Sequence, residues 1–325
     1  MSDIRVLALS GGVGGARLLR GLQRVVPPGT LAALVNTGDD FEHLGLRISP
    51  DIDTALYTLG GLAHPAQGWG RHDETWNFME VLAAIGGETW FRLGDRDLAL
   101  HVERTRRLKA GETLTAVTQA FAQRFGIDAK IFPMSDDPVA TRVITEEGEL
   151  AFQDYFVRRQ CAPVVRGLRF MGAEKAELSD AARAAFASPE LEAIIIAPSN
   201  PWLSVDPLLA IPELRDALSS ATVPIIAVTP IIAGKAVKGP TAKIMSELGI
   251  EVSPVAVAAH YGDLLDGFVL DSRDAVFVDR FRMPVEVADT LMTAPEGSAR
   301  VAQTALRLAS ALKIQSVFPQ PEGGM

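Results

Sequence analysis

The sequence predicts an α/β fold built on a Rossmann-like, doubly wound and mostly parallel sheet, with an inserted helical lid region. Three observations predict this class. The chain opens with an apolar strand, a glycine-rich turn and a helix; short apolar runs recur later; and helical patterns lie between them. Because strands that alternate with helices form parallel sheets, the ligand crevice is expected beyond the carboxyl ends of the strands.

Length and composition indicate a single large globular domain over residues 1–325. The chain is 48% hydrophobic and 22% charged, which is enough to bury a core, and its formal net charge of -9 argues against nucleic acid as a partner. Cys161 is the only cysteine, which excludes an internal disulfide and fits a reducing cytoplasm. The opening apolar stretch is too short for a membrane span and lacks a signal peptide's basic flank, so we expect a cytoplasmic protein without a membrane partner.

Four apolar runs are predicted to be strands buried on both faces of the sheet. They are residues 4–9, 31–35, 193–197 and 223–228. Each run ends in a glycine-rich, acidic or proline-containing segment. Since parallel strands end at the same edge of a sheet, these segments are expected to lie close together.

Five segments show apolar residues at helical spacing and are predicted to be helices. They are residues 75–85, 113–125, 179–186, 212–218 and 298–312. Residues 69–169 are more helical in pattern and include a hairpin that turns at residues 146–148, so we expect an inserted lid there and no independent domain. The tail, residues 319–325, is expected to fray.

The first turn of the predicted sheet is rich in glycine. Gly11, Gly12, Gly14 and Gly15 lie between the first strand and the first helix, where backbone N–H groups can approach a phosphate at the positive end of the helix. The loop is not a dinucleotide fingerprint, because Arg17 replaces the third glycine, and no Gly-Lys-Ser/Thr follows to make a P-loop. The alternative is a tight turn in which glycine permits close packing of the helix and strand.

Four carboxylates follow the second strand within a short stretch. Asp39 and Asp40 come directly after it, and Asp51 and Asp53 lie in the next loop; oxygen ligands of this kind suit Mg2+, which also binds substrate phosphates. Alternatively, Ser49 caps a helix and Asp51 only favours its dipole. Residues two apart on a helix point to nearly opposite sides, and direct roles are therefore predicted for Asp39 and Asp53.

A charged string opens another predicted helix. Arg96 can bind an anionic or carbonyl oxygen through its forked donors, and Asp95 beside it can hold its orientation. The alternative is a solvated helix start or cap, which is the usual role of such charge runs.

Two later loops offer polar groups at strand ends. Ser199 and Asn200 lie between two prolines and suit a base or ribose pocket, while Lys235 and Lys238 can reach a phosphate. Taken singly, each of these features is more often only a loop.

Taken together, several strings resemble the CofD/FbiA family of 2-phospho-L-lactate or phosphoenolpyruvate transferases of coenzyme F-420 biosynthesis. The strings are SGGVGGARLLRGL, VNTGDDFEHLGLRISPDIDTALYTLGG, GWGRHDETW, FRLGDRDLALH, APSNPWLS, PIIAGKAVKGP and LLDGFVLD. The resemblance implies a Rossmann-like fold, usually a homodimer, that binds Mg2+ and the deazaflavin precursor Fo (7,8-didemethyl-8-hydroxy-5-deazariboflavin). It also implies a reaction in which the terminal ribityl hydroxyl of Fo attacks a guanosine diphosphate-linked acid, GMP leaves and (dehydro) coenzyme F-420-0 forms.

The resemblance also implies roles for the residues at the matching motif positions. The glycine loop with Ser199 and Asn200 holds the guanosine diphosphate, and Asp39 and Asp53 bind metal or Fo or act as base. The residues expected to line the deazaflavin pocket are Asn36, Thr37, Asp95 and Arg96. Which of the four acids holds the ion stays open at this point.

Two other functions remain as alternatives. A regulatory nucleotide-sugar-binding protein of the YvcK type shares the glycine loop and the fold, and an NAD-dependent oxidoreductase shares the strand-turn-helix opening. The five histidines lack metal-ligand spacing and no Gly-x-Ser-x-Gly occurs, which argues against zinc and hydrolase chemistry. Within the family, the donor acid stays open between lactate, enolpyruvate and glycerate, and the strings GWGRHDETW and SPDIDTALYTLGG favour enolpyruvate.

Overall fold

The central feature of the molecule is a seven-stranded sheet in which all pairs of neighbours are parallel. A computed structural model describes residues 4–65 and 67–317; the predicted frayed tail lies outside these residues. Along the sheet the strands are β14 (Val285–Ala288), β13 (Gly267–Asp271), β10 (Ile225–Val228), β9 (Ala193–Ile196), β1 (Val6–Ser10), β2 (Leu31–Val35) and β5 (Lys130–Pro133). The predicted fold class is confirmed.

The four predicted apolar runs supply the centre of the sheet, and all residues of β1, β2, β9 and β10 are buried. Side chains alternate between the two faces, so that Leu7 and Leu9 enter one hydrophobic core while Val6 and Ala8 enter the other. Both faces of the sheet are therefore covered, as expected for a doubly wound fold.

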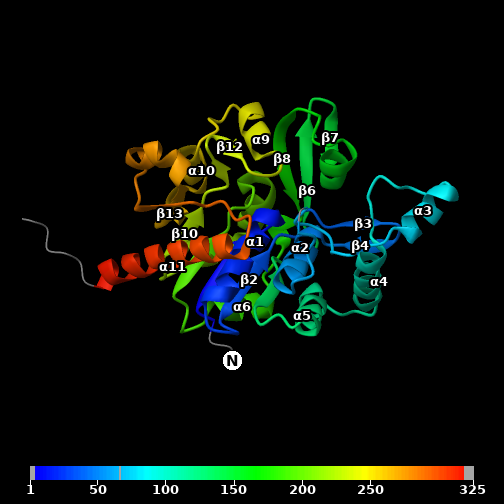
Figure 1. Cartoon of the computed structure of the whole chain (residues 1–325), viewed down its shortest axis with the longest axis horizontal. Helices are drawn as coiled ribbons and strands as arrows, with labels where there is room; N and C mark the ends of the chain where they lie inside the picture. Colours follow the sequence, from blue (N-terminus) through cyan, green and yellow to red (C-terminus); the bar gives the residue numbers. More distant parts are fainter. Residues whose placement is uncertain (1–3, 66, 318–325) are drawn as a thin grey trace, which may run out of the picture.

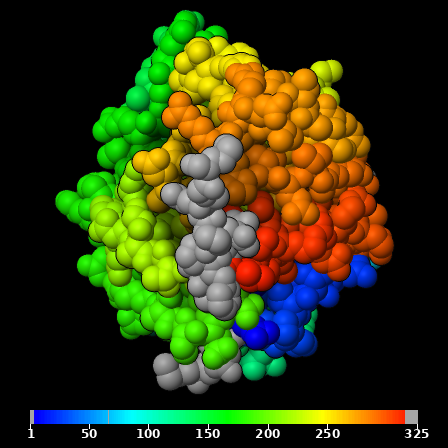
Figure 2. All heavy atoms as spheres, turned by 90° about the vertical axis from the view of Figure 1, so that its left-hand side faces the viewer, coloured from blue at the N-terminus to red at the C-terminus, as the bar shows by residue number. Residues whose placement is uncertain are grey.

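Two sets of helices cover the two faces. One core includes residues of α1 (Gly12–Val25), α2 (Pro50–Leu59), α5 (Leu114–Arg124) and α11 (Pro295–Val317). The other includes residues of α6 (Asp180–Phe186), α7 (Asp206–Leu209), α8 (Pro212–Ser219), α9 (Thr241–Glu247) and α10 (Pro254–Tyr261). The side view shows the red atoms of α11 between the orange atoms of the preceding segments and the blue atoms of the amino-terminal segment (Figure 2).

An arm projects from one side of the sheet (Figure 1, right). It consists of the hairpin β3 (Phe41–His43) and β4 (Leu46–Ile48) with the helices α3 (Asn77–Ala84) and α4 (Asp95–Lys109). A small separate core around Ile48, Met79 and Leu93 holds it together. The arm lies next to the carboxyl end of β2, where the predicted acids are.

Helices fill only the first part of the segment predicted as a helical insertion. Residues 69–169 contain α3, α4 and α5, but then supply β5 of the central sheet. A separate antiparallel sheet follows, made of β7 (Gly148–Ala151), β6 (Ala140–Thr145) and β8 (Val165–Met171). The predicted hairpin turn at residues 146–148 joins β6 to β7.

Short elements complete the fold. They are a hairpin of β11 (Ile231–Ile232) and β12 (Lys235–Ala236), the π-helices η1 (Asp154–Arg158) and η3 (Pro201–Val205), and the 3-10 helices η2 (Ala173–Lys175), η4 (Gly262–Leu264) and η5 (Ser272–Arg280). Among the described residues, none of the helices combines the length and apolar character that a bilayer crossing demands.

Candidate active site

The predicted motifs meet at the carboxyl ends of three adjacent strands. β1 pairs with both β2 and β9, so the loops that follow these strands are neighbours. The Gly11 N–H donates to Ser199 Oγ at 3.0 Å, and Ser199 Oγ donates back to the Gly11 carbonyl at 2.7 Å. The Asn36 N–H donates to the Ser10 carbonyl at 2.9 Å. The glycine loop, the acidic segment and the Pro-Ser-Asn-Pro loop are therefore brought together, as predicted.

Most glycines of the first loop allow close packing. A Cβ on Gly14 would lie 2.4 Å from the Pro198 carbonyl oxygen, and a Cβ on Gly15 would lie 2.4 Å from Ser10 Oγ. Gly12 differs, because its φ of +64° favours glycine and the space around it is open. The close-packing interpretation therefore holds for most of the loop, and only Gly12 has open space beside it.

The Asp39 and Asp51 carboxylates both accept a hydrogen bond from the side-chain amide of Asn36. Asn36 Nδ2 donates to Asp39 Oδ1 at 2.9 Å and to Asp51 Oδ2 at 3.0 Å. Both acids are buried, with 8% and 7% of their surface exposed. Neither forms an ion pair with a lysine or arginine in the part of the chain that the structure describes. An acid of the loop after β2 and an acid of α2 thus share one neutral partner.

Burial and mutual repulsion disfavour the charged forms of these acids. Burial, with repulsion from Asp51 and Asp40, raises the pKa of Asp39 well above its ordinary value. Burial also raises the pKa of Asp51 to about 6, against hydrogen bonds from Asn36 and the Gly12 N–H. Asp40 accepts a hydrogen bond from Ser49 Oγ at 2.6 Å, yet burial raises its pKa to about 7. Arg47 and Arg104 lower the pKa of Asp40 in part, whereas no cation among the described residues acts in this way on Asp39 or Asp51.

Asp53 has a different environment, because it forms a buried ion pair with Arg104 of α4. Arg104 Nη1 lies 3.1 Å from Asp53 Oδ2, and Arg104 Nη2 contacts the second oxygen. Arg104 is fully buried. Burial lowers the pKa of its guanidinium, but the Asp53 carboxylate outweighs burial and raises it overall. Both Asp53 oxygens are thus engaged by a permanent cation.

The ion pair continues into a network along α4. His101 Nδ1 lies 3.7 Å from Asp53 Oδ2, and His101 Nε2 lies 3.3 Å from Asp97 Oδ2. Tyr57 Oη donates to Asp97 Oδ1 at 2.5 Å. Burial opposes the ionisation of Asp97, but the bonds from His101 and Tyr57 lower its pKa overall. Helix α4 of the arm is therefore connected to α2 by ionisable side chains. Of these side chains, only Asp53 was predicted to belong to the site.

A divalent ion fits one group of acids better than the other. The ligand atoms of Asp53, Asp97 and His101 lie within 4.8 Å of one another, but Arg104 already neutralises Asp53. Asp39 and Asp51 present buried oxygens without a cation, which is the arrangement that Mg2+ would relieve. From the sequence, a direct role was predicted for Asp53 and not for Asp51. Helical spacing shows that the two side chains point apart, but it does not show which of them faces Asp39.

Asp95 and Arg96 lie on the arm at the start of α4. The Asp95 carboxylate accepts hydrogen bonds from Thr75 Oγ1 at 2.6 Å, from the Phe78 N–H at 3.0 Å and from Asn77, and these bonds lower its pKa to about 2. It therefore holds the start of α3. The Arg96 side chain is exposed and forms no hydrogen bond or ion pair with any described residue.

Buried polar atoms without partners mark the interior of the site. Within the described residues, Thr37 Oγ1, Asp40 Oδ1 and Asn200 Nδ2 are buried and lack a hydrogen-bond partner. Asn200 Oδ1 meanwhile accepts from the N–H groups of Trp202 and Leu203 and fixes the start of η3. Since buried polar groups are normally satisfied, these atoms are available to a ligand.

A cavity of about 440 Å³ opens beside Thr37 and Asp40. Its walls come from the acidic loop, the turn between α4 and α5, and the loop between β5 and β6. Arg47 and Ser135 contribute further polar groups. A cavity of this size holds a small-molecule ligand.

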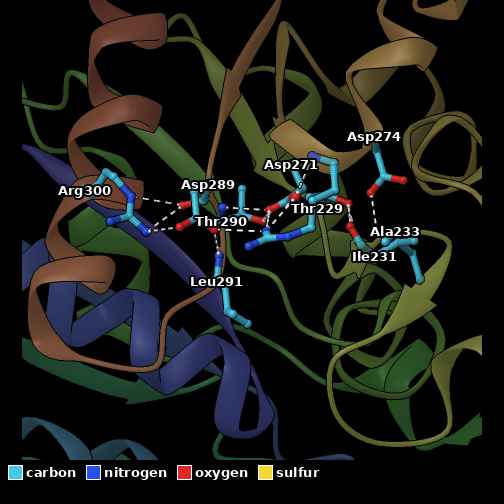
Figure 3. Close-up of polar contacts among 10 residues, drawn as sticks. Thr229, Ile231, Ala233, Asp271, Asp274, Asp289, Thr290, Leu291 and Arg300 are labelled. Carbon is cyan, nitrogen blue, oxygen red and sulfur yellow. Dashed lines mark hydrogen bonds and ion pairs between the residues drawn. The ribbon is translucent and has the colours of Figure 1, made fainter.

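The hairpin that carries Lys235 is anchored to the end of β13. The Ala233 N–H, on a residue with a φ of +51°, donates to the Asp274 carboxylate at 2.8 Å (Figure 3). Nearby, the buried Asp271 carboxylate accepts from the Thr290 N–H at 2.8 Å and from Thr290 Oγ1 at 2.7 Å (Figure 3). The hairpin is therefore held in place, while Lys235 itself is exposed.

Comparison with known proteins identifies the family. The profile described as "2-phospho-L-lactate transferase CofD" matches residues 6–305. The chain belongs to the CofD family. The phosphoenolpyruvate transferase of Streptomyces coelicolor is 40% identical, over 95% of this chain and 99% of that one. The phosphoenolpyruvate transferase of Thermobifida fusca is 39% identical, over 96% of this chain and 100% of that one.

Membership of the CofD family makes the chain a transferase enzyme, which favours this function over the regulatory and oxidoreductase alternatives. A solved structure adds support for the fold alone: a UPF0052 family protein of Bacillus halodurans has a TM-score of 0.61 at 14% identity, over 93% of this chain and 99% of that one. The acidic cluster and the glycine loop thus lie at the carboxyl edge of the sheet of a CofD-family chain.

Proposed function

We propose that the protein transfers a phosphorylated three-carbon acid from a guanosine diphosphate donor to the terminal ribityl hydroxyl of Fo. The reaction uses Mg2+, releases GMP and yields (dehydro) coenzyme F-420-0. The observation that carries the proposal is the pair Asp39 and Asp51, two buried carboxylates that share Asn36 beside the first turn of α1.

The carboxylate pair supports a Mg2+ site. Burying two neighbouring carboxylates without a counter-ion is unfavourable, and a bound divalent cation removes the repulsion. Asp39 and Asp51 would hold the ion, which neutralises charge on a diphosphate when bound. Asp53 remains predicted to be required for turnover, through its position in the Arg104 network.

The chain's own residues are arranged to align two substrates. The open space beside Gly12 and the unpartnered Asn200 Nδ2 support binding of the guanosine diphosphate. The cavity beside Thr37 and Asp40 supports binding of Fo. Such transfer depends mainly on alignment of the nucleophile with the leaving group.

Asp40 is the best-placed proton acceptor for the ribityl hydroxyl. It lines the cavity, its Oδ1 has no partner among the described residues, and burial raises its pKa to about 7. A base with a pKa near the working pH is the most effective. Asp39, if it holds the metal ion, would be a poorer base.

The similarity to phosphoenolpyruvate transferases at about 40% identity along the whole chain supports enolpyruvate as the acid of the donor. By analogy with the family, we further propose that the enzyme works as a homodimer in the cytoplasm.

An assay with competing donors tests the proposal. Purified protein is incubated with Fo, Mg2+ and equal amounts of the enolpyruvyl, lactyl and glyceryl guanosine diphosphates, and GMP and the product masses are measured. We expect Mg2+-dependent GMP release with the enolpyruvyl product in excess. Absence of GMP release with every donor would refute the transfer, and an excess of another product would refute the choice of acid.

A further inference from the structure

The basic residues on one face of α1 are not equally compensated. Arg24 lies 3.7 Å from Glu296 of α11, and Arg20 Nη2 donates to Ser298 Oγ of the same helix at 3.1 Å. Arg17, nearest to the glycine loop, is half-buried, yet its side chain forms no hydrogen bond or ion pair with any residue that the structure describes. The uncompensated arginine is therefore the one closest to the candidate active site.

Arg17 meets a second cation from a distant part of the chain. A Cβ built on Gly68 would lie 3.4 Å from Arg17 Nη2, 3.5 Å from Lys238 Nζ and 2.7 Å from Val13 Cγ1. Gly68 has a φ of +76°, so the backbone itself favours glycine there. Three segments thus converge beside the first turn of α1, with two cationic nitrogens around a residue that has no side chain.

Two like charges lie close together here, with Arg17 half-buried and Lys238 exposed to solvent. Burial and the neighbouring Arg17 lower the pKa of Lys238, and burial lowers that of Arg17. Lys238 Nζ donates to the Gln67 carbonyl at 2.6 Å, a neutral partner, and forms no ion pair with a described acid. Like charges held together in this way favour a bound anion.

The surroundings indicate which anion fits. Val13 lies in the first turn of α1, where N–H groups lack partners within the helix. The Gly12 N–H at the beginning of the same turn donates to the Asp51 carboxylate of α2. An anion here would thus lie beside the two cations and close to the turn that contacts the proposed metal-binding acids.

We propose that Arg17 and Lys238, positioned around Gly68, form a subsite for the diphosphate of the donor. The forked donors of Arg17 and the ammonium of Lys238 suit the oxygens of a phosphate chain. The identity of the donor rests on the proposed function, whereas the affinity of the subsite for a diphosphate does not.

Calorimetric titration tests the subsite with inorganic pyrophosphate and GDP in the presence of Mg2+. We expect Arg17→Gln and Lys238→Gln each to weaken binding of both probes roughly tenfold, as for loss of one charge-assisted contact. Gly68→Ala keeps both charges but places a methyl group between them and is expected to weaken binding similarly. Arg24→Gln, on the same helix face, serves as the matched control and should bind as the parent protein does.

The outcomes separate this inference from the proposed function. Unchanged pyrophosphate and GDP affinities in both charge variants, with unchanged melting temperatures, would overturn the subsite even if transfer to Fo is observed. Weakened pyrophosphate binding in the variants would support it even if the parent protein transfers nothing to Fo. Arg17→Lys keeps the charge and is expected to recover part of the affinity that Arg17→Gln loses. A charge-based role would be contradicted if Arg17→Lys and Arg17→Gln lose the same affinity while Lys238→Gln binds normally.

Discussion

The two acids of the first turn of α2 lie two residues apart but have opposite environments. Asp53 is neutralised by the buried Arg104, and the network around it ties the arm to the sheet. Asp51 shares Asn36 with Asp39 and has no cationic partner among the described residues. The comparison separates an acid whose ion pair joins two elements from a pair of acids, Asp39 and Asp51, that suits the proposed Mg2+ site.

The largest loss of turnover is expected when one of the two acids without a cation, Asp39 or Asp51, is replaced. Asp39→Asn or Asp51→Asn should lower turnover at least roughly hundredfold, because an oriented electrostatic contact to the reacting diphosphate is lost. Both variants should also melt at a higher temperature than the parent protein without Mg2+, since repulsion between buried carboxylates is removed.

GMP release and thermal melting measure these two effects together. Asp216→Asn, an exposed acid of α8, serves as the control. Normal turnover in both Asp39→Asn and Asp51→Asn would show that the pair neither binds a metal nor contacts substrate.

The next largest effect is on stability and concerns the ion pair between Asp53 and Arg104. Arg104→Gln leaves Asp53 buried without a cation and should lower the free energy of unfolding by roughly 3–5 kcal/mol. Replacing both partners, as Asp53→Leu with Arg104→Met, should recover much of that loss. Urea denaturation provides the measurement, with the exposed Arg106→Gln of the same helix as control. If Arg104→Gln unfolds at the same urea concentration as the parent protein, the ion pair does not stabilise the fold.

The acidic cluster should also give the metal-free protein a distinctive pH dependence. Burial raises the pKa of Asp51 to about 6 and that of Asp40 to about 7, so the folded state binds more protons than the unfolded state above pH 3.8. The contribution of these acids to the free energy of unfolding therefore falls as the pH rises from about 4 to about 7, by up to ~1.4 kcal/mol per pH unit for each group.

Denaturation at pH 5 to 8 with a chelator, for the parent protein and Asp51→Asn, isolates this contribution. We expect the parent to lose stability relative to the variant as the pH rises, and Mg2+ to restore it. A constant difference between the two proteins across this range would contradict the raised pKa.

The smallest effect is expected at the far end of the compensated network. Tyr57→Phe removes the hydrogen bond to Asp97 but leaves the contact between Asp97 and His101. Unfolding should become easier by about 1 kcal/mol, with turnover unchanged. A large loss of turnover would show that the hydrogen bond from Tyr57 to Asp97 is itself needed for catalysis.

Much of the fold could be predicted because its strands and helices follow from the pattern of apolar residues along the chain. The runs at residues 31–35 and 193–197 are uniformly apolar and became central strands. β5, β13 and β14 were not predicted; β5 contains an exposed lysine and β14 is a partly exposed edge strand, so neither shows a uniform apolar pattern. The hairpin turn at residues 146–148 followed from its turn residues.

The sequence predicted where the candidate site lies, but not the contacts that its side chains make. The glycine loop, Asn36 and Ser199 do meet, because strand ends in a parallel sheet share one edge. Asp95 was expected to contact the deazaflavin, but in the structure its carboxylate holds the start of α3, which supports the helix-cap alternative. Whether it also contacts Fo stays a prediction.

The sequence by itself determined the α/β class, the edge of the sheet that carries the site, and the family. Only the tertiary structure decided that Asp51 lies beside Asp39, that Arg104 neutralises Asp53, and that Lys238 meets Arg17 at Gly68. The physical reason is that strand and helix patterns depend on neighbouring residues, whereas the charge state and role of a side chain depend on partners that folding brings from far along the chain.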